Sequence, residues 1–535
     1  MYELVIRNGL IVDGTGGDSF IGDIAIEGEL IAKIGQITER GQTEIDATGW
    51  VISPGFIDSH THSDLALLKQ PEALPKITQG ITTEIVGNCG FSVAPIIKNA
   101  GIQTYQSYSV PVLGFSDVNW DWETYSEYLD KVTQAKPAVN VASLIGHGTI
   151  RSAIMGFENR RPTNEELSQM TYLLNQAMQQ GALGLSTGLV YAPGTYSEDE
   201  EIIELACVVA KYGGVYATHL RNQADGLVES VKEAIQIGIQ SGVSVHISHH
   251  KTVGKQNFGM VDETLRLLDE VLEDGIWTSS DAYPYLAGNT TLAALLPSWL
   301  LEGGVNEMLN RLSDPILIRK AVGDIESGIP GWENRMKAIG YDNVILNAFK
   351  TKKNKIYQGM KITEIAQARK ELVLECVFNL LIEEDGEIGV ILINSTERDL
   401  IAVLKHPRTV VGSDGIYSGE TAHPRLYGTF PRIVKRYVQE SNIFPLEEAI
   451  HKMTGLTARI FGLDHQIGFL KPGFRADVVV FDPSTIEDCA TYEHPHVFSK
   501  GIKHVFVGGI AALKDGKVTG IRNGKALRHS PARNC

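Results

Sequence analysis

The middle of the chain repeats one pattern, an amphipathic helix followed by a glycine and a short apolar strand. Residues 163–180 place their apolar side chains on one helical face, and the run ALGLSTGLV follows Gly181. The same order recurs before VYATHL, VSVHISHH and IWTSSDAYPY. Strands that alternate with helices pair in parallel, and so many units in succession favour a closed barrel over an open sheet. We therefore predict an α/β protein with a (β/α)8 TIM-like barrel over residues 56–464.

Two of these helices begin with the sequence of a capping box. Thr163 is followed three residues later by Glu166, and Ser197 is followed by Glu200. In a capping box the first side chain accepts a hydrogen bond from the backbone of the fourth residue, whose acidic side chain reaches back. The sequence therefore predicts helices that begin directly after Thr163 and Ser197.

Both ends of the chain differ from the middle. Residues 1–55 and 465–535 alternate short β-branched runs with Gly-Asp and Glu-Gly turns. We predict that the two ends form one small discontinuous β-sandwich domain. Residues 286–348 break the alternation of helices and strands, because they are rich in apolar residues and contain several Gly and Pro. We interpret them as an insertion and a candidate lid.

Charge and composition restrict the classes of partner. The net charge of −16 over 535 residues argues against nucleic acid, whose phosphates require basic patches. No apolar run approaches the ~20 residues of a membrane helix, and no secretory signal is evident at the N-terminus. Five scattered cysteines do not form a disulfide framework. These features predict a soluble cytoplasmic protein that acts on a small-molecule substrate, and they leave its oligomeric state open.

Polar residues that can bind a metal stand at the ends of several predicted strands. PGFIDSHTHSD closes an apolar run with two histidines at positions i and i+2, and GITTEIVGNCGFS ends a strand with a cysteine. The full set comprises His60, His62, Cys89, His219, His246, His249, His250 and Asp414. The C-terminal ends of barrel strands meet at one face, and a nitrogen, sulfur and oxygen ligand set suits Zn²⁺. The sequence therefore predicts a zinc site.

The same motifs resemble a known family, the N-acyl-D-amino-acid deacylases (D-aminoacylases) of the amidohydrolase superfamily. The resemblance covers nearly the whole chain and includes LIGHGTIR, GALGLSTGLVYAPGTYS, YATHLRNQ, ISHHK, SDAYPY, VGSDG, HPRLYGTFPRIV and LKPGFRADVVVFDP. The H-x-H motif is shared by the whole superfamily and is weakly specific. The contexts of Cys89, Lys251, Tyr283 and Arg425 are far more specific.

The resemblance implies how the metal is held. Many binuclear amidohydrolases carry a carboxylated Lys on the fourth barrel strand, but GALGLSTGL has no Lys. In the deacylases a cysteine after the second strand binds the metal instead, and Cys89 stands there. By resemblance one zinc is held tightly by Cys89, His219 and His249. The resemblance also implies a second metal site formed by His60, His62 and Asp414, and the sequence does not show whether this site binds a metal. His246 and His250 are expected to be neighbours of the site.

The resemblance also implies catalytic and substrate-binding residues. Asp414 is expected to act as general base, taking a proton from water and passing it to the leaving amine. Lys251, Tyr191, Tyr283 and Arg425 are expected to hold the carboxylate of the substrate. His147 matches a family motif, and we interpret it as a core or positioning residue.

The expected reaction is hydrolysis of the amide bond of N-acyl-D-amino acids to a carboxylate and a free D-amino acid. Family members that prefer acidic residues carry an Arg after the YPY motif, whereas residues 286–301 contain no basic residue. A neutral or hydrophobic side chain is therefore expected. The alternatives are cyclic amides, as in dihydropyrimidinase or dihydroorotase, N-acyl-D-residues of peptides, and a non-catalytic scaffold that has lost its ligands.

Overall fold

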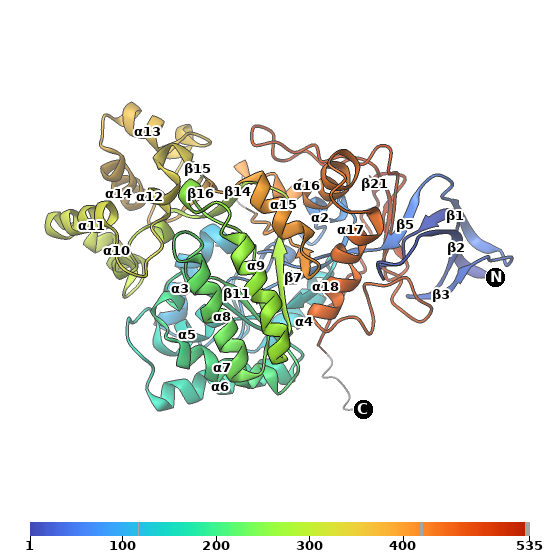
Figure 1. Cartoon of the computed structure of the whole chain (residues 1–535), viewed down its shortest axis with the longest axis horizontal. Coiled ribbons are helices and arrows are strands. Elements are labelled where there is room, and N and C mark those ends of the chain that lie inside the picture. The colour runs from blue at the N-terminus through green and yellow to red at the C-terminus, as the bar shows by residue number, and fades with distance from the viewer. Residues whose placement is uncertain (116, 418–420, 530–535) are drawn as a thin grey trace.

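The computed structural model describes residues 1–115, 117–417 and 421–529. The molecule is elongated: a central barrel separates a β-domain, at the right of Figure 1, from a mainly helical insertion at its left. The N-terminus lies in the β-domain, and the β-rich C-terminal segments return to the same end of the molecule.

Eight parallel strand positions form the barrel. They are β6 (Phe56–Asp58), β7 (Ile81–Val86), β8 (Asn140–Ser143) with its continuation β9 (Ile145–Gly146), β10 (Gly184–Gly188), β11 (Val215–His219), β12 (Ser244–Ile247), β13 (Thr278–Ala282) and β17 (Thr409–Val411). The amide of Ser59 donates to the carbonyl of Val411 over 3.3 Å, which joins the first position to the last. The predicted (β/α)8 barrel is confirmed.

Helices pack around this ring. They are α1 (Ala66–Lys69), α2 (Leu74–Ile77), α3 (Ala100–Leu113), α4 (Tyr125–Ala135), α5 (His147–Met155), α6 (Asn164–Gln179), α7 (Asp199–Ala210), α8 (Leu227–Ser241), α9 (Val261–Glu270), α15 (Glu397–Lys405), α16 (Arg425–Arg432), α17 (Leu446–Met453) and α18 (Gly455–Ile460). Their apolar faces and the barrel strands share one large buried core.

One of the two predicted capping boxes forms and the other does not. Thr163 and Glu166 make both reciprocal bonds at the start of α6, as predicted. The prediction at Ser197 is wrong, because α7 begins one residue later and Glu198 is its N-cap. The hydroxyl of Ser197 instead donates to the carbonyl of Gly194 over 2.6 Å, so it closes the preceding turn and is not available to the helix.

Strands from both termini share one nine-stranded sheet. From the N-terminal end come β1 (Tyr2–Ile11), β2 (Phe20–Glu27), β3 (Leu30–Gly35), β4 (Gly41–Asp46) and β5 (Val51–Pro54), and from the C-terminal end β18 (Val478–Phe481), β19 (Ile502–Val507), β20 (Ile510–Lys514) and β21 (Lys517–Val518). The two groups meet where β5 and β18 pair antiparallel. A bridge between Leu30 and Arg475 brings the β3 edge back toward β18, so the sheet folds around an apolar core of its own.

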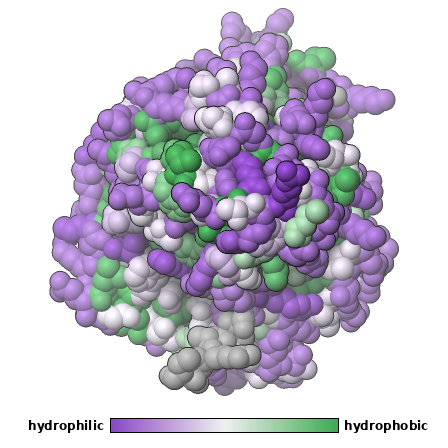
Figure 2. Space-filling model, turned by 90° about the vertical axis from the view of Figure 1, so that its right-hand side faces the viewer, coloured by the Kyte–Doolittle hydropathy of each residue, from purple (hydrophilic) through white to green (hydrophobic). Residues whose placement is uncertain are grey.

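The outer surface of this end suits contact with water. Figure 2 faces the right-hand side of Figure 1 and shows mainly hydrophilic residues, with hydrophobic ones in small separate groups. Among the described residues, no helix is both long and apolar enough to cross a membrane. The predicted limits of the small domain, 1–55 and 465–535, stay a prediction, and residues 530–535 lie outside the described part.

The insertion leaves the barrel after β13 and is built on a three-stranded antiparallel sheet. Its elements are β14 (Ala287–Thr291), α10 (Val305–Arg311), α11 (Pro315–Ser327), α12 (Arg335–Ile339), β15 (Val344–Phe349), α13 (Ile362–Arg369), α14 (Val373–Glu383) and β16 (Ile388–Ile393). The expected limit at 348 falls inside β15. The sheet continues to Ile393 because β16 is its central strand and pairs with both β14 and β15.

A buried ion cluster ties the first barrel strand to the last. The ammonium of Lys76 donates to Asp58 Oδ2 over 2.6 Å and lies 3.4 Å from Glu84 Oε2. The amide of Ser413, beyond β17, donates to Asp58 Oδ1 over 2.7 Å. All four residues are fully buried. Lys76 is therefore the cation that balances two carboxylates inside the barrel.

We predict that Lys76→Met destabilises the fold by about 3–5 kcal/mol, because removing one partner leaves buried carboxylates without their cation. Urea unfolding measures the effect. Lys232→Met is the matched control, since Lys232 and Glu229 form an exposed pair worth at most about 1 kcal/mol. A loss in Lys76→Met no larger than in the control would contradict this reading of the cluster.

Candidate active site and metal centre

Three of the predicted site residues stand just beyond barrel strands with left-handed backbone. The φ angles are 54° at Cys89, 35° at His249 and 48° at Asp414. Non-glycine residues adopt this conformation at a cost, and such positions cluster at functional sites. Beside Cys89, a Cβ on Gly90 would stand 2.8 Å from the amide of Gly188. The Asn-Cys-Gly loop therefore needs its glycine so that the backbone can turn tightly and aim the thiol into the barrel mouth.

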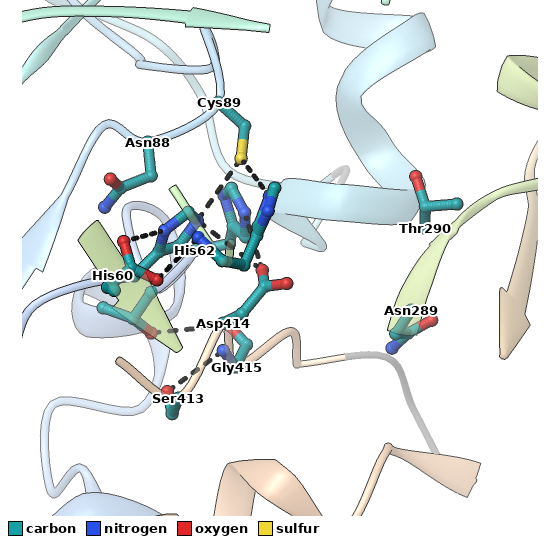
Figure 3. A network of polar contacts seen from close by, with 12 residues as sticks. His60, His62, Asn88, Cys89, Asn289, Thr290, Ser413, Asp414 and Gly415 are labelled. Atoms are coloured by element: carbon teal, nitrogen blue, oxygen red, sulfur yellow. Dashed lines mark hydrogen bonds and ion pairs between the residues drawn. The ribbon is translucent and has the colours of Figure 1, made fainter. Parts of the chain in front are cut away.

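The six predicted metal ligands converge there. Cys89 Sγ lies 3.3 Å from His60 Nε2 and 3.3 Å from His249 Nε2. His62 Nε2 lies 3.3 Å from Asp414 Oδ1, and the rings of His219 and His249 are 4.3 Å apart. Figure 3 shows Cys89 and Asp414 on opposite sides of the histidine group. Three sets have ligand atoms within 4.8 Å of one another: His60, His62 and Cys89; Cys89, His219 and His249; His60, His249 and Asp414.

The electrostatics of these side chains fit a zinc ion. Burial opposes ionisation of the Cys89 thiol, but His60 and His62 hold its pKa below the usual value and favour thiolate. Burial and the nearby cations lower the pKa values of His219 and His249 well below the usual range. Both rings are therefore neutral, which is the form that binds metal. A thiolate and neutral imidazoles are the ligands that Zn²⁺ prefers.

Asp281, which the sequence analysis did not assign, orients the histidines. Its Oδ2 lies 3.1 Å from His60 Nδ1 and 2.9 Å from His246 Nε2, and its Oδ1 accepts from the amide of His249 over 2.9 Å. A carboxylate on Nδ1 fixes the tautomer of His60 so that Nε2 faces the metal position. The only sequence signal was an Asp near a strand end in SDAYPY.

We expect Asp281→Asn to weaken zinc binding by about 10–100-fold, because a neutral amide no longer fixes the ring of His60 or raises its basicity. Competition with a chromophoric chelator measures the affinity, and circular dichroism checks the fold. Zinc affinity within twofold of the unchanged protein would show that Asp281 does not act on the metal centre.

The four predicted carboxylate-binding residues lie beside the ligand cluster. The guanidinium of Arg425 lies 4.5 Å, and the ammonium of Lys251 5.3 Å, from the centre of the Tyr283 ring. Arg425 Nη2 donates to Asp414 Oδ2 over 2.9 Å. Arg425 Nη1 and the Tyr283 hydroxyl are buried and have no partner among the described residues. These donors are therefore available to a bound carboxylate.

Lys251 and Tyr191 complete this side of the site. Burial lowers the pKa of Lys251 to about 7. The Tyr191 hydroxyl lies 2.9 Å from Thr290 Oγ1, and its ring packs edge-on to His219 with centroids 4.9 Å apart. Lys251, Tyr191 and Tyr283 line one pocket together with Cys89, His219, His249 and Asp414.

Arg335 is a second residue that the sequence analysis did not find. It belongs to α12 of the insertion, is paired with Glu333, and places Nη2 2.8 Å from His219 Nε2. Glu333 also accepts from the amide of Gln223, whose side chain lies 3.2 Å from His249 Nδ1. The insertion thus contacts the surroundings of two predicted ligands. GWENR has no strand-end pattern, so the sequence carries no signal for it.

Three other histidines from the sequence analysis, His246, His250 and His147, lie outside the three ligand sets. His246 lies 2.8 Å from Ser279 Oγ, and His250 Nε2 lies 2.8 Å from Thr264 Oγ1. His147 Nε2 lies 2.6 Å from Glu201 Oε1 in the core. His246 and His250 therefore lie outside the ligand sets, as expected, and His147 is a buried residue paired with Glu201, in agreement with its interpretation as a core or positioning residue.

Comparison with known proteins places the chain in a family. The amidohydrolase family matches residues 43–293 and 358–511. D-aminoacylase of Alcaligenes xylosoxydans xylosoxydans is 35% identical over 94% of this chain and 93% of its own. The zinc and phosphonate complex of N-acyl-D-glutamate deacylase from Bordetella bronchiseptica is 31% identical, with a TM-score of 0.84 over 98% of this chain and 99% of that one. A solved structure of D-aminoacylase, from work on its binuclear metal centre, is 35% identical to this chain. Its TM-score is 0.83, and the match covers 99% of this chain and 100% of that one.

These matches extend over most of the chain, and they agree with the barrel and with the ligand cluster at its mouth. The chain belongs to the amidohydrolase family, in the group that includes D-aminoacylase and the N-acyl-D-amino-acid deacylases.

Proposed function

We propose that this protein hydrolyses the amide bond of N-acyl-D-amino acids with uncharged side chains, using zinc, and releases a carboxylate and a free D-amino acid. One observation carries the proposal. The Cys89–His219–His249 set stands beside donors that suit a carboxylate, and Asp414 lies between the two groups. An N-acyl amino acid needs both elements, because its carboxylate must be held while its amide is cut.

Cys89, His219 and His249 would hold one tight zinc ion, and His60, His62 and Asp414 a second, weaker one. When bound, zinc supplies Lewis acidity to the amide carbonyl and lowers the pKa of water. Asp414 would take the proton of the attacking water and deliver it to the leaving nitrogen. Burial opposes its ionisation, but Arg425 and the two histidines hold the pKa of Asp414 well below its usual range. At neutral pH it is therefore ionised, as a base must be.

The charges of the pocket support an uncharged substrate side chain. Arg425 is paired with Asp414 and Arg335 with Glu333. Among the described residues that line the pocket, Lys251 is the ammonium or guanidinium group without a carboxylate in an ion pair. A bound carboxylate would stabilise its charged form against the effect of burial. One such group matches a substrate that carries a single carboxylate. A second carboxylate on the substrate side chain would be buried without a cation of its own.

Preference for the D enantiomer rests on the relatives, which are named for D-amino acids. Cyclic amides are disfavoured because β10 carries no Lys, whereas Cys89 is present. N-acyl-D-residues of peptides remain an alternative substrate class, and a cytoplasmic location stays a prediction.

A panel of substrates tests the proposal. Zinc-loaded protein receives N-acetyl-D-leucine, N-acetyl-L-leucine, dihydrouracil and hydantoin, and free amine or ring opening is followed. We expect release from the D enantiomer only. Turnover of the cyclic amides without release from N-acetyl-D-leucine would contradict the proposal and favour the dihydropyrimidinase-like alternative.

A further inference from the structure

The wall of the pocket that faces the metal centre is polar, and the insertion supplies it. Asn289 and Thr290 belong to β14, and Asn394 directly follows β16, its neighbour in the sheet. Figure 3 shows Asn289 and Thr290 across the site from Asp414 and Cys89. The same lining contains the apolar side chains of Phe91, Val112, Leu392 and Ile416. A few polar groups placed among apolar side chains fix the orientation of a ligand.

Two amides in that wall have unused hydrogen-bonding atoms. Asn289 is 8% exposed, and neither Oδ1 nor Nδ2 has a partner among the described residues. Asn394 is 5% exposed, and its Oδ1 is likewise unpartnered. Thr290 differs, because its hydroxyl is paired with Tyr191. Buried polar atoms without partners are costly, so a free donor and acceptor on one buried amide point to a ligand that satisfies both.

These amides lie next to the carboxylate-binding group. Arg425 Nη2 donates to the backbone carbonyl of Asn289 over 3.5 Å. A Cβ on Gly288 would lie 3.3 Å from both Asn394 Nδ2 and the Tyr283 hydroxyl, so these two groups flank the same glycine. In an amino acid the carboxylate and the side chain share one carbon. The wall beside the carboxylate site is therefore where the substrate side chain comes to lie.

We infer that Asn289, supported by Asn394, selects N-acyl-D-amino acids whose side chain ends in a carboxamide, the D-glutamine and D-asparagine class. This inference rests on the proposed function and narrows its uncharged class. A carboxamide offers one acceptor and two donors, so it pairs with both free atoms of Asn289. A carboxylate has no donor for Asn289 Oδ1, and an apolar side chain leaves both atoms unsatisfied. A site built to hydrogen-bond a substrate group discriminates strongly against analogues that lack it.

The test uses three side chains of similar length on zinc-loaded, full-length protein. We compare kcat/KM for N-acetyl-D-glutamine, N-acetyl-D-methionine and N-acetyl-D-glutamate. We expect glutamine to exceed each of the others by about tenfold or more. In Asn289→Leu the glutamine-to-methionine ratio should fall to about one or below, because the amide partner is lost while the apolar lining grows. Asn306→Leu, at an exposed position on α10 of the same insertion, should keep the original ratio.

The outcomes separate the two proposals. Methionine cleaved as well as glutamine by the unchanged protein, or a ratio that survives Asn289→Leu, would overturn the inference and leave the proposed function intact. Cleavage of none of the three substrates would overturn both. If Asn289→Leu does not fold, the ratio in the unchanged protein still decides, and Asn289→Ser provides a smaller variant.

Discussion

Asp414→Asn is expected to lower kcat for N-acetyl-D-leucine hydrolysis by about 10³-fold, within the range of a lost general base. The amide keeps the shape of the side chain but cannot accept a proton at neutral pH. Asp414 is ionised in the protein because Arg425, His60 and His62 stabilise its negative charge. Amine release, with zinc content measured on the same sample, separates a lost base from a lost metal.

Asp515→Asn is the matched control, since Asp515 is 74% exposed and remote from the site. It should keep full activity. If Asp414→Asn retained more than a tenth of the activity with normal zinc content, another group would have to act as the base.

Cys89→Ser is expected to weaken zinc binding by at least about 100-fold and to abolish activity with it, because a neutral hydroxyl replaces a thiolate ligand. The Sγ atom lies 3.3 Å from the Nε2 atoms of both His60 and His249. A chelator competition assay measures the affinity, and elemental analysis gives the zinc content.

Cys489→Ser serves as its control, because Cys489 is half-buried and belongs to none of the three ligand sets. It should bind zinc like the unchanged protein. One zinc per chain at unchanged affinity in Cys89→Ser would remove the cysteine from the metal site.

The sequence allowed the barrel and the ligand cluster to be predicted for the same physical reason. Helix and strand periods show in the hydrophobic pattern, and the ends of parallel strands must meet at one face. His219 ends one barrel strand, and Cys89 and His249 stand just beyond two others, yet the ligand atoms of all three come within 4.8 Å of one another. Residues at the ends of barrel strands were therefore accessible to sequence reasoning.

The residues that the insertion contributes to the pocket could not be predicted from the sequence. Arg335 reaches the pocket from the start of α12 and Asn289 from β14 of the antiparallel sheet, and no local pattern encodes the position of these elements over the barrel. The expected insertion ended at residue 348, because no local pattern shows that the chain after α13 and α14 returns to the same sheet through β16. The helix start predicted at Ser197 was also wrong. The capping sequence is present, but the Ser197 hydroxyl donates to the carbonyl of Gly194 in the preceding turn.

Zinc dependence is tested most directly by titrating metal-free protein with zinc while amine release from N-acetyl-D-leucine is followed. We expect no release without metal and activity that rises with the first equivalent of zinc per chain, whereas N-acetyl-L-leucine should not be cleaved at any zinc content. Full activity in the metal-free protein, or none at any zinc content, would contradict a zinc-dependent deacylase of D-amino acids.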